Sequence, residues 1–329
     1  MKTFSNQYLK EFWKVIVATF MGFINDNGLK LSASLAYYTV FSIAPLLILV
    51  ISITSLVLRH YSFNDTLYAQ MQEFIGNQAT AQIQEVVKNL QLSGKTGTAL
   101  ISGIAILLLG ASSMFVEIQD SLNIIWRVKA KPKKGWVKLL ENRFLSFSLI
   151  ISLGFLLLVS LIINIAVKAL STKLEHFLHY ITVTIFELIN VAITLLVIAV
   201  LFGIIFKFLP DVKIKWKDVR AGAIFTALLF MFGQYLIGLY IQYAAQTSAY
   251  GAAGSIIVIL VWIYYTSAIL YIGAEFTQVY AEAMGRSIEP AEYAVHVEQT
   301  EVEQEVTNLP PQNPNLQGHL QALKKGRVQ

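Results

Sequence analysis

Five long stretches of this sequence contain no charged residue and no histidine, and this feature constrains the fold more than any other. The stretches are 28, 21, 24, 19 and 54 residues long and occupy 31–58, 96–116, 144–167, 188–206 and 221–274. A helix needs about 20 mostly apolar residues to cross a membrane hydrocarbon layer of about 30 Å. The first four stretches therefore fit one span each, and the last fits two. Only 14% of the 329 residues are charged, whereas a soluble domain has about 25%.

We therefore predict an all-α integral membrane protein with six transmembrane helices. The spans are placed near 35–58, 97–116, 144–167, 188–206, 221–245 and 255–274. A cytoplasmic amphipathic segment at 1–30 precedes the membrane domain at 31–285, and a cytoplasmic tail follows at 286–329. Glutamates and then a proline-rich run dominate the tail, and this composition predicts disorder.

The basic residues predict the orientation of these spans. Of the 25 Lys and Arg residues, 20 lie near the two ends of the chain or in the second and fourth connections between spans. Short segments rich in Lys and Arg stay in the cytoplasm. Both termini are therefore predicted inside, and the segments 59–96 and 168–187 outside.

Two segments outside the spans show helical patterns. The first 30 residues carry apolar and small side chains at helical spacing, which predicts a short amphipathic helix on the cytoplasmic surface. These residues are Phe12, Ile16, Thr19, Phe20 and Phe23. The external segment 62–90 has a similar pattern, and we predict one or two amphipathic helices that are broken around Gly76.

Polar side chains inside the spans are the candidates for a functional site, because a polar group that faces lipid is costly. Such groups tend to face a partner helix or an aqueous cavity. The candidate pathway or coupling residues are Ser34, Tyr38 and Ser42 in the first span, Gln234 and Gln242 in the fifth, and Tyr264, Ser267, Tyr271 and Glu275 along the last. The alternative is that these residues only hydrogen-bond one helix to another.

Glu275 stands out because it follows 54 uncharged positions at the cytoplasmic end of the last span. If buried, its carboxyl would have a raised proton affinity and could exchange a proton or cation during transport. The alternative is an interfacial or salt-bridged structural glutamate. Asp26 precedes the first span, and Lys30, Arg127 and Lys207 are available as partners.

Proline and glycine mark two places where a helix is expected to change. Pro45 lacks a backbone donor and should kink the first span or loosen its hydrogen bonds. Gly251 and Gly254 lie in an uncharged connection between the last two spans. That connection is either a plain hairpin turn or a broken-helix element whose freed backbone groups bind a ligand.

The sequence offers little for metal, nucleotide or enzymatic chemistry. The string Ser93-Gly94-Lys95-Thr96 has Asn89 where a phosphate-binding loop requires glycine. The five histidines are scattered, and there is no cysteine, so we expect no metal site, no cofactor and no catalytic residue. The basic residues lie near span ends, and we expect them to contact anionic lipid headgroups rather than nucleic acid.

Four segments resemble the YihY/virulence factor BrkB family of bacterial inner-membrane proteins. They are LSASLAYYTVFSIAPLLILV (31–50), SLNIIWRVKAKPKKGW (121–136), FLPDVKIKWKDVRAGA (208–223) and SAYGAAGSIIVILVWIYYTSAILYIGAEFTQVYAE (248–282). The resemblance covers about 10–285 and implies a six-helix, multi-pass protein of the inner membrane. Members were once labelled ribonuclease BN, but metal-assisted phosphodiester hydrolysis would need a tight Asp and His cluster that this sequence lacks.

Two functional hypotheses follow. The first is a transport-type protein that moves an ion, small solute or lipid through a hydrated cavity near Tyr38, Gln242, Tyr271 and Glu275. The second is a non-catalytic membrane scaffold or envelope-assembly factor that acts through its external segment or its tail. The expected partners are membrane lipids and an unknown transported substrate, and a homo-oligomer is an alternative to a single chain.

Overall fold

The computed structural model describes 2–57, 113–131, 181–244 and 251–298, together with a few isolated positions. The chain divides into two units, Met1–His296 and Val297–Gln329. All elements below belong to the first unit. The predicted spans near 97–116 and 144–167 lie almost entirely outside the described residues, and the external segment lies outside them apart from one isolated position.

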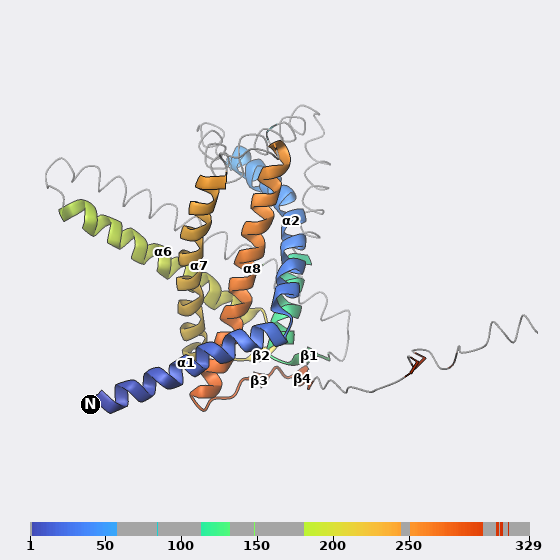
Figure 1. Ribbon diagram of the computed structural model, residues 1–329. Coiled ribbons are helices and arrows are strands. Elements are labelled where there is room, and N and C mark those ends of the chain that lie inside the picture. The colour runs from blue at the N-terminus through green and yellow to red at the C-terminus, as the bar shows by residue number, and fades with distance from the viewer. Residues whose placement is uncertain are drawn as a thin grey trace, which may run out of the picture. The chain divides into compact units, whose positions relative to one another are not determined.

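The described part of the chain is mostly helical, as predicted. Its helices are α1 (Lys2–Asn25), α2 (Gly28–Val57), α6 (Ile181–Phe208), α7 (Trp216–Ala244) and α8 (Gly251–Ala283), and a further helical segment covers 113–125 (Figure 1). Two stretches, Leu188–Phe208 in α6 and Trp216–Leu236 in α7, are long and apolar enough to cross a membrane.

Two glycine–threonine pairs let α7 and α8 pack closely. A Cβ atom on Gly222 would overlap Thr277 Oγ1, and one on Gly273 would overlap Thr226 Oγ1. Each threonine hydroxyl donates to a carbonyl of its own helix: Thr226 to Gly222 at 2.7 Å and Thr277 to Gly273 at 2.7 Å. The Gly-x-x-x-Thr spacing therefore occurs on both helices, and small residues at this spacing are typical of membrane helices in close contact.

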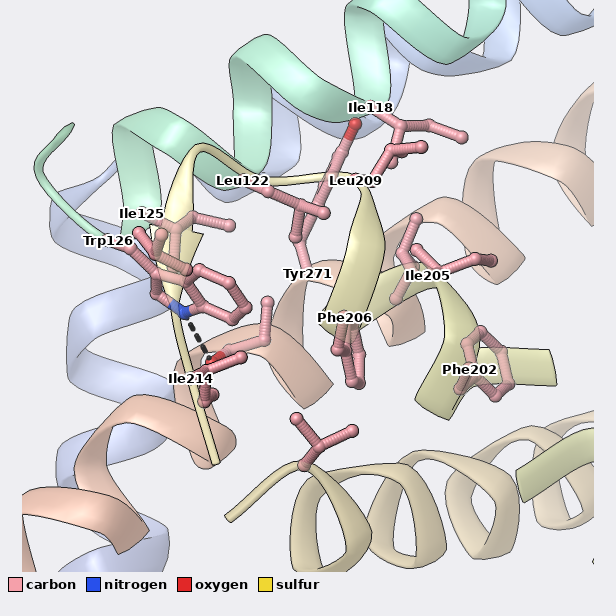
Figure 2. Close-up of a cluster of buried hydrophobic side chains, with 14 of the residues drawn as sticks. Ile118, Leu122, Ile125, Trp126, Phe202, Ile205, Phe206, Leu209, Ile214 and Tyr271 are labelled. Atoms are coloured by element: carbon pink, nitrogen blue, oxygen red, sulfur yellow. Dashed lines mark hydrogen bonds between the residues drawn. The ribbon is translucent and has the colours of Figure 1, made fainter. Parts of the chain in front are cut away.

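A buried apolar cluster forms where the segment 113–125 meets α8 and the connection between α6 and α7. Figure 2 shows Leu122 and Ile125 facing Leu209 and Tyr271 in this cluster. Trp126 Nε1 donates a hydrogen bond of 3.1 Å to the carbonyl of Ala274. The cluster thus fixes the predicted cytoplasmic end of α8 against segments that are distant in sequence.

Two short antiparallel ladders add strands that the sequence did not predict. Strand β1 (Val128–Ala130) pairs with β4 (Ala294–His296), and β2 (Val212–Lys213) pairs with β3 (Glu289–Pro290). All four strands lie at the same end of the unit as the last turns of α8 (Figure 1).

The tail was predicted to be disordered from 286, but its first part, 289–296, is ordered because it contains the paired strands β3 and β4. Gly285, with φ of +68°, ends α8. The amides of Gly285 and Arg286 bond back to the carbonyls of Glu282 and Ala281 at 2.8 and 2.9 Å. This helix-ending turn returns the chain to β1 and β2. Composition alone indicated disorder because the strand partners are far away in sequence.

Helix α1 is longer than the short amphipathic helix predicted, and its buried face is partly different. It packs against α8, with Val15, Thr19 and Phe23 buried. Phe12 and Phe20 belong to the predicted apolar stripe, yet they are 38% and 43% exposed. Phe12 nevertheless contacts Phe276 of α8, with 6.3 Å between ring centroids, so the predicted stripe is buried only in part, through Thr19 and Phe23.

Candidate functional site

Glu275 is buried at the contact between α1 and α8. The residue is only 3% exposed, and no described residue forms a hydrogen bond with its Oε1 atom. Gly22 of α1 faces this carboxylate, since a Cβ atom there would lie 2.7 Å from Glu275 Oε2. The sequence left open whether Glu275 is buried or interfacial, and in the structure it is buried.

Asp26 brings a second carboxyl to the same place. It lies one helical turn after Gly22, to whose carbonyl its amide donates at 2.9 Å, and it precedes the turn residue Asn27, with φ of +55°. Burial, followed by the neighbouring Asp26 carboxyl, raises the pKa of Glu275 to about 9, whereas the Arg127 guanidinium opposes this shift and Glu282 adds to it. Glu275 follows the last predicted span, and its burial beside Asp26 favours the protonated form of its carboxyl.

Tyr271 lies one turn before Glu275 on α8 and is fully buried. Figure 2 shows its ring reaching from α8 toward Ile118 in the segment 113–125. Within the described residues, the Tyr271 hydroxyl and the Ser121 hydroxyl are both buried without a partner at full hydrogen-bond geometry, and the two hydroxyls lie close enough to interact with each other. Buried polar atoms without partners are rare in native proteins and point to water, an ion or a functional role.

The other predicted residues of α8 have different surroundings. Ser267 is buried, and its hydroxyl donates at 2.8 Å to the carbonyl of Ile263 in its own helix. Tyr264 is half-buried. The lower part of the predicted stripe, from Tyr271 to Glu275, is therefore the part with unpaired buried polar groups.

The stripes predicted on the first and fifth spans do not join this cluster within the described residues. Tyr38 is 39% exposed, Ser34 is half-buried and Gln234 is exposed. Ser42 is buried, and its hydroxyl donates to the carbonyl of Thr39 at 2.9 Å and contacts Met114 Sδ at 3.8 Å. The side chain of Gln242 lies outside the described part. Helical periodicity located these polar residues but did not determine which of them face one another.

The structure also describes the backbone at Pro45, Gly251 and Gly254 and the surroundings of Lys207. Helix α2 continues through Pro45 and ends at Val57. Helix α8 begins at Gly251 and already includes Gly254, so Gly254 lies in helix and not in a turn. The predicted partner Lys207 instead donates to the carbonyl of Ile214 and lies 5.9 Å from the Trp216 ring centroid.

A second buried carboxylate, Asp211, was missed by the sequence analysis. It lies in the connection between α6 and α7 and is 3% exposed. Gln119 Nε2 and Asn123 Nδ2 donate to it at 3.1 and 2.8 Å, and the Tyr293 hydroxyl donates at 2.9 Å. Its own amide donates to Asn123 Oδ1 at 2.9 Å. Asp211 therefore joins three segments that lie far apart in the chain.

One sequence signal could have indicated this role. Gln119 and Asn123 are four residues apart and so share a helix face, and Asp211 follows Pro210 in a short connection between two apolar stretches. The arrangement is structural in character because hydrogen bonds engage both carboxylate oxygens of Asp211. In the described part of the chain, no group of three or more His, Cys, Asp or Glu side chains is arranged to hold a metal ion.

Comparisons with known proteins agree with the sequence patterns. The family described as Virulence factor BrkB matches residues 19–295. A UPF0761 membrane protein of Pseudomonas aeruginosa is 28% identical over 260 residues, which cover 77% of this chain and 59% of the relative. A UPF0761 membrane protein of Vibrio vulnificus is 26% identical over 269 residues, covering 79% and 80%.

A UPF0761 membrane protein of Chlorobium limicola is 27% identical over 295 residues, which cover 86% of this chain and 62% of the relative. The chain thus spans about three-fifths of the length of the Pseudomonas and Chlorobium relatives. No solved structure matches the chain.

Proposed function

Because this chain belongs to the virulence factor BrkB family of membrane proteins, we propose that it is a transport protein of the bacterial inner membrane. In this proposal six helices cross the membrane with both termini in the cytoplasm, and the substrate is an ion, a small solute or a lipid. The uncharged stretches and the 20 basic residues on one side of the predicted topology support this arrangement.

The observation that carries the proposal is the buried carboxyl of Glu275. A carboxyl group that is withdrawn from water, beside a second carboxyl and with one oxygen unpaired, is costly to ionise. Stabilising interactions alone do not explain why such a group is placed where α1 meets α8. Ionisable groups within membrane helices are associated with ion pathways and proton relays, and Glu275 lies in α8 directly after the predicted span 255–274.

The proposed step is a change of charge at this contact. In the protonated state, the Glu275 carboxyl is neutral and α1 stays packed against it through Gly22. Loss of the proton leaves a carboxylate beside Asp26, and the two negative charges then favour entry of a cation, return of a proton or separation of α1 from α8. Any of these changes would make access to a pathway near Tyr271 depend on whether Glu275 is protonated.

A scaffold or envelope-assembly role is the second candidate. It is favoured by the outward position of Tyr38 and Gln234, because these stripes do not converge on the Glu275 cluster within the described residues. It predicts that Glu275→Gln has no functional effect while deletion of 62–90 does. We propose no enzymatic activity, including the ribonuclease activity once assigned to similar proteins.

Reconstitution tests the transport proposal. Purified full chain is placed in liposomes that contain a pH-sensitive dye, and sodium or potassium gradients are imposed. We expect a cation-dependent pH change that Glu275→Gln abolishes. Glu289→Gln is the matched control, because it makes the same chemical change on an exposed residue of β3 that is not among the groups shifting the pKa of Glu275. If wild type and both variants show no pH change, simple cation–proton exchange is excluded and the scaffold role gains support.

A further inference from the structure

The end of the connection between α6 and α7, together with the first turns of α7, carries a basic surface that the proposed transport step does not use. Lys215, Lys217 and Arg220 are exposed, and Trp216 beside them is 50% exposed. We name these four residues the basic turn. Lys217 and Arg220 are three positions apart in α7, so their side chains lie on one side of the helix.

The charges of the basic turn are not neutralised by nearby acidic residues. Asp218 binds Arg286, and Asp211 accepts hydrogen bonds from Gln119, Asn123 and Tyr293. Lys213 is different, because it pairs with Glu292 at 3.0 Å. Within the described residues, none of the three cations of the basic turn has an acidic partner within 4 Å, and the surface has a net positive charge.

The position of this surface relates it to a membrane. It lies where two stretches that are long and apolar enough to cross one, Leu188–Phe208 and Trp216–Leu236, are joined. Lys215 is in the connection, and the other three residues are in the first turns of the second stretch. Only seven residues join them, so when both cross the membrane they meet at the same face. The basic turn is then at the depth of the lipid headgroups.

An aromatic pair fits this depth. Phe208, which is 50% exposed, contacts Trp216 edge to face, with 6.0 Å between ring centroids. Lys207 lies 5.9 Å from the centroid of the Trp216 ring. Tryptophan and basic residues are both enriched where a helix leaves the hydrocarbon layer.

We propose that the basic turn binds the phosphate headgroup of an anionic phospholipid, with Trp216 against the upper part of the acyl chains. Lys217 and Arg220 supply the charge that recognises the phosphate, and Lys215 extends the surface toward the connection. The proposal relies on the membrane placement in the proposed function but not on the transport step. Anionic lipid bound here would hold the joined ends of α6 and α7 at the membrane face.

Lipid binding to the full chain in a neutral detergent tests the proposal. Dioleoyl phosphatidylglycerol and dioleoyl phosphatidylcholine are titrated, and the bound lipids are counted by native mass spectrometry. The double variant Lys217→Gln/Arg220→Gln should bind phosphatidylglycerol about 25-fold more weakly, because each basic residue near an anionic surface contributes about fivefold. Phosphatidylcholine binding should not change.

The matched control is Lys129→Gln/Lys131→Gln, which removes two exposed cations at the same end of the unit. An equal loss of phosphatidylglycerol binding in this control would show that the lipid is attracted to positive charge in general, and it would overturn the proposal. Unchanged phosphatidylglycerol binding by Lys217→Gln/Arg220→Gln would overturn it too. Competition by inorganic phosphate at equal concentration would show a soluble-anion site and would also overturn it.

A charge-conserving exchange keeps the test decisive if the glutamine variant does not fold. Lys217→Arg/Arg220→Lys retains both cations, and it should retain phosphatidylglycerol binding within about threefold. Trp216→Leu keeps every charge of the turn but removes the aromatic ring, and it should weaken binding severalfold. Full binding by Trp216→Leu, together with loss of binding in the charge-conserving variant, would contradict the proposed roles. Neither outcome depends on the liposome assay for transport.

Discussion

Gly22 of α1 lies against the carboxylate of Glu275 of α8, so that a Cβ atom at position 22 would be 2.7 Å from Glu275 Oε2 and 3.1 Å from its Cδ. The two residues are more than 250 positions apart in the sequence. The carboxyl is buried at this contact, and its Oε1 atom has no hydrogen-bond partner in the part of the chain that the structure describes. The absence of a side chain at position 22 is therefore a condition for the buried state of Glu275.

We expect Gly22→Ala to destabilise the contact between α1 and α8 by about 1–3 kcal/mol, as overpacking of a buried site does. The same change should cost less in a Glu275→Ala background, because the shortened side chain leaves room for the new methyl group. The measurement is a double-mutant cycle on the free energy of unfolding in mixed micelles. Strictly additive effects would contradict the contact.

The pH dependence of stability should reveal the protonation of Glu275. Since the folded-state pKa is raised to about 9, the folded chain holds a proton that the unfolded chain releases near the ordinary carboxyl pKa of about 4.5. Stability from this group is complete below the unfolded value and is lost as pH rises toward 9.

The experiment compares the melting temperature of wild type with that of Glu275→Gln between pH 5 and pH 9. We expect the difference between the two proteins to grow in favour of the glutamine variant as pH rises, because glutamine cannot ionise. Glu289→Gln, at an exposed residue of β3, should follow wild type throughout. A constant difference over this range would show that Glu275 does not titrate between the two pH values.

The close packing of α7 on α8 predicts that alanine is not tolerated at Gly222 but is tolerated at Gly203. Gly222→Ala should destabilise the protein by several kcal/mol, because the new Cβ would meet the side chain of Thr277 and lie 3.3 Å from its Cα atom. Gly203→Ala in α6 is the control, since its Cβ would make ordinary contacts of 3.7 Å with Ala223 and 3.8 Å with Val219. Thermal unfolding of both variants measures the difference, and equal tolerance would count against the Gly–Thr packing.

The hydrogen bonds of Asp211 should contribute to the order of the chain after α8. We expect Tyr293→Phe to cost about 2 kcal/mol, because it removes a hydrogen bond to a buried carboxylate. Limited proteolysis should then cut faster between 287 and 298. Tyr235→Phe is a suitable control because Tyr235 is 64% exposed on α7, and similar proteolysis rates in the two variants would refute the proposed role of Tyr293.

Much of the described secondary structure could be predicted from the sequence, because it depends on local properties. Spans predicted near 188–206 and 255–274 lie within α6 and α8. The polar stripe on α8 also follows from helical periodicity, and two of its members, Tyr271 and Glu275, are buried in the structure. The Gly-x-x-x-Thr spacing of Gly222 and Gly273 was equally visible in the sequence, but its meaning depended on which two helices pack together.

The sequence by itself determined that the chain is an apolar, mostly helical membrane protein and that Glu275 is an isolated charge at the end of a long uncharged stretch. Only the tertiary structure decided that Gly22 and Asp26 cover this carboxyl, that Asp211 is shared by three distant segments, and that residues 289–296 form strands. The physical reason is that helix formation and hydropathy depend on neighbouring residues. Burial and hydrogen bonding instead depend on which groups the fold brings together from positions far apart in the chain.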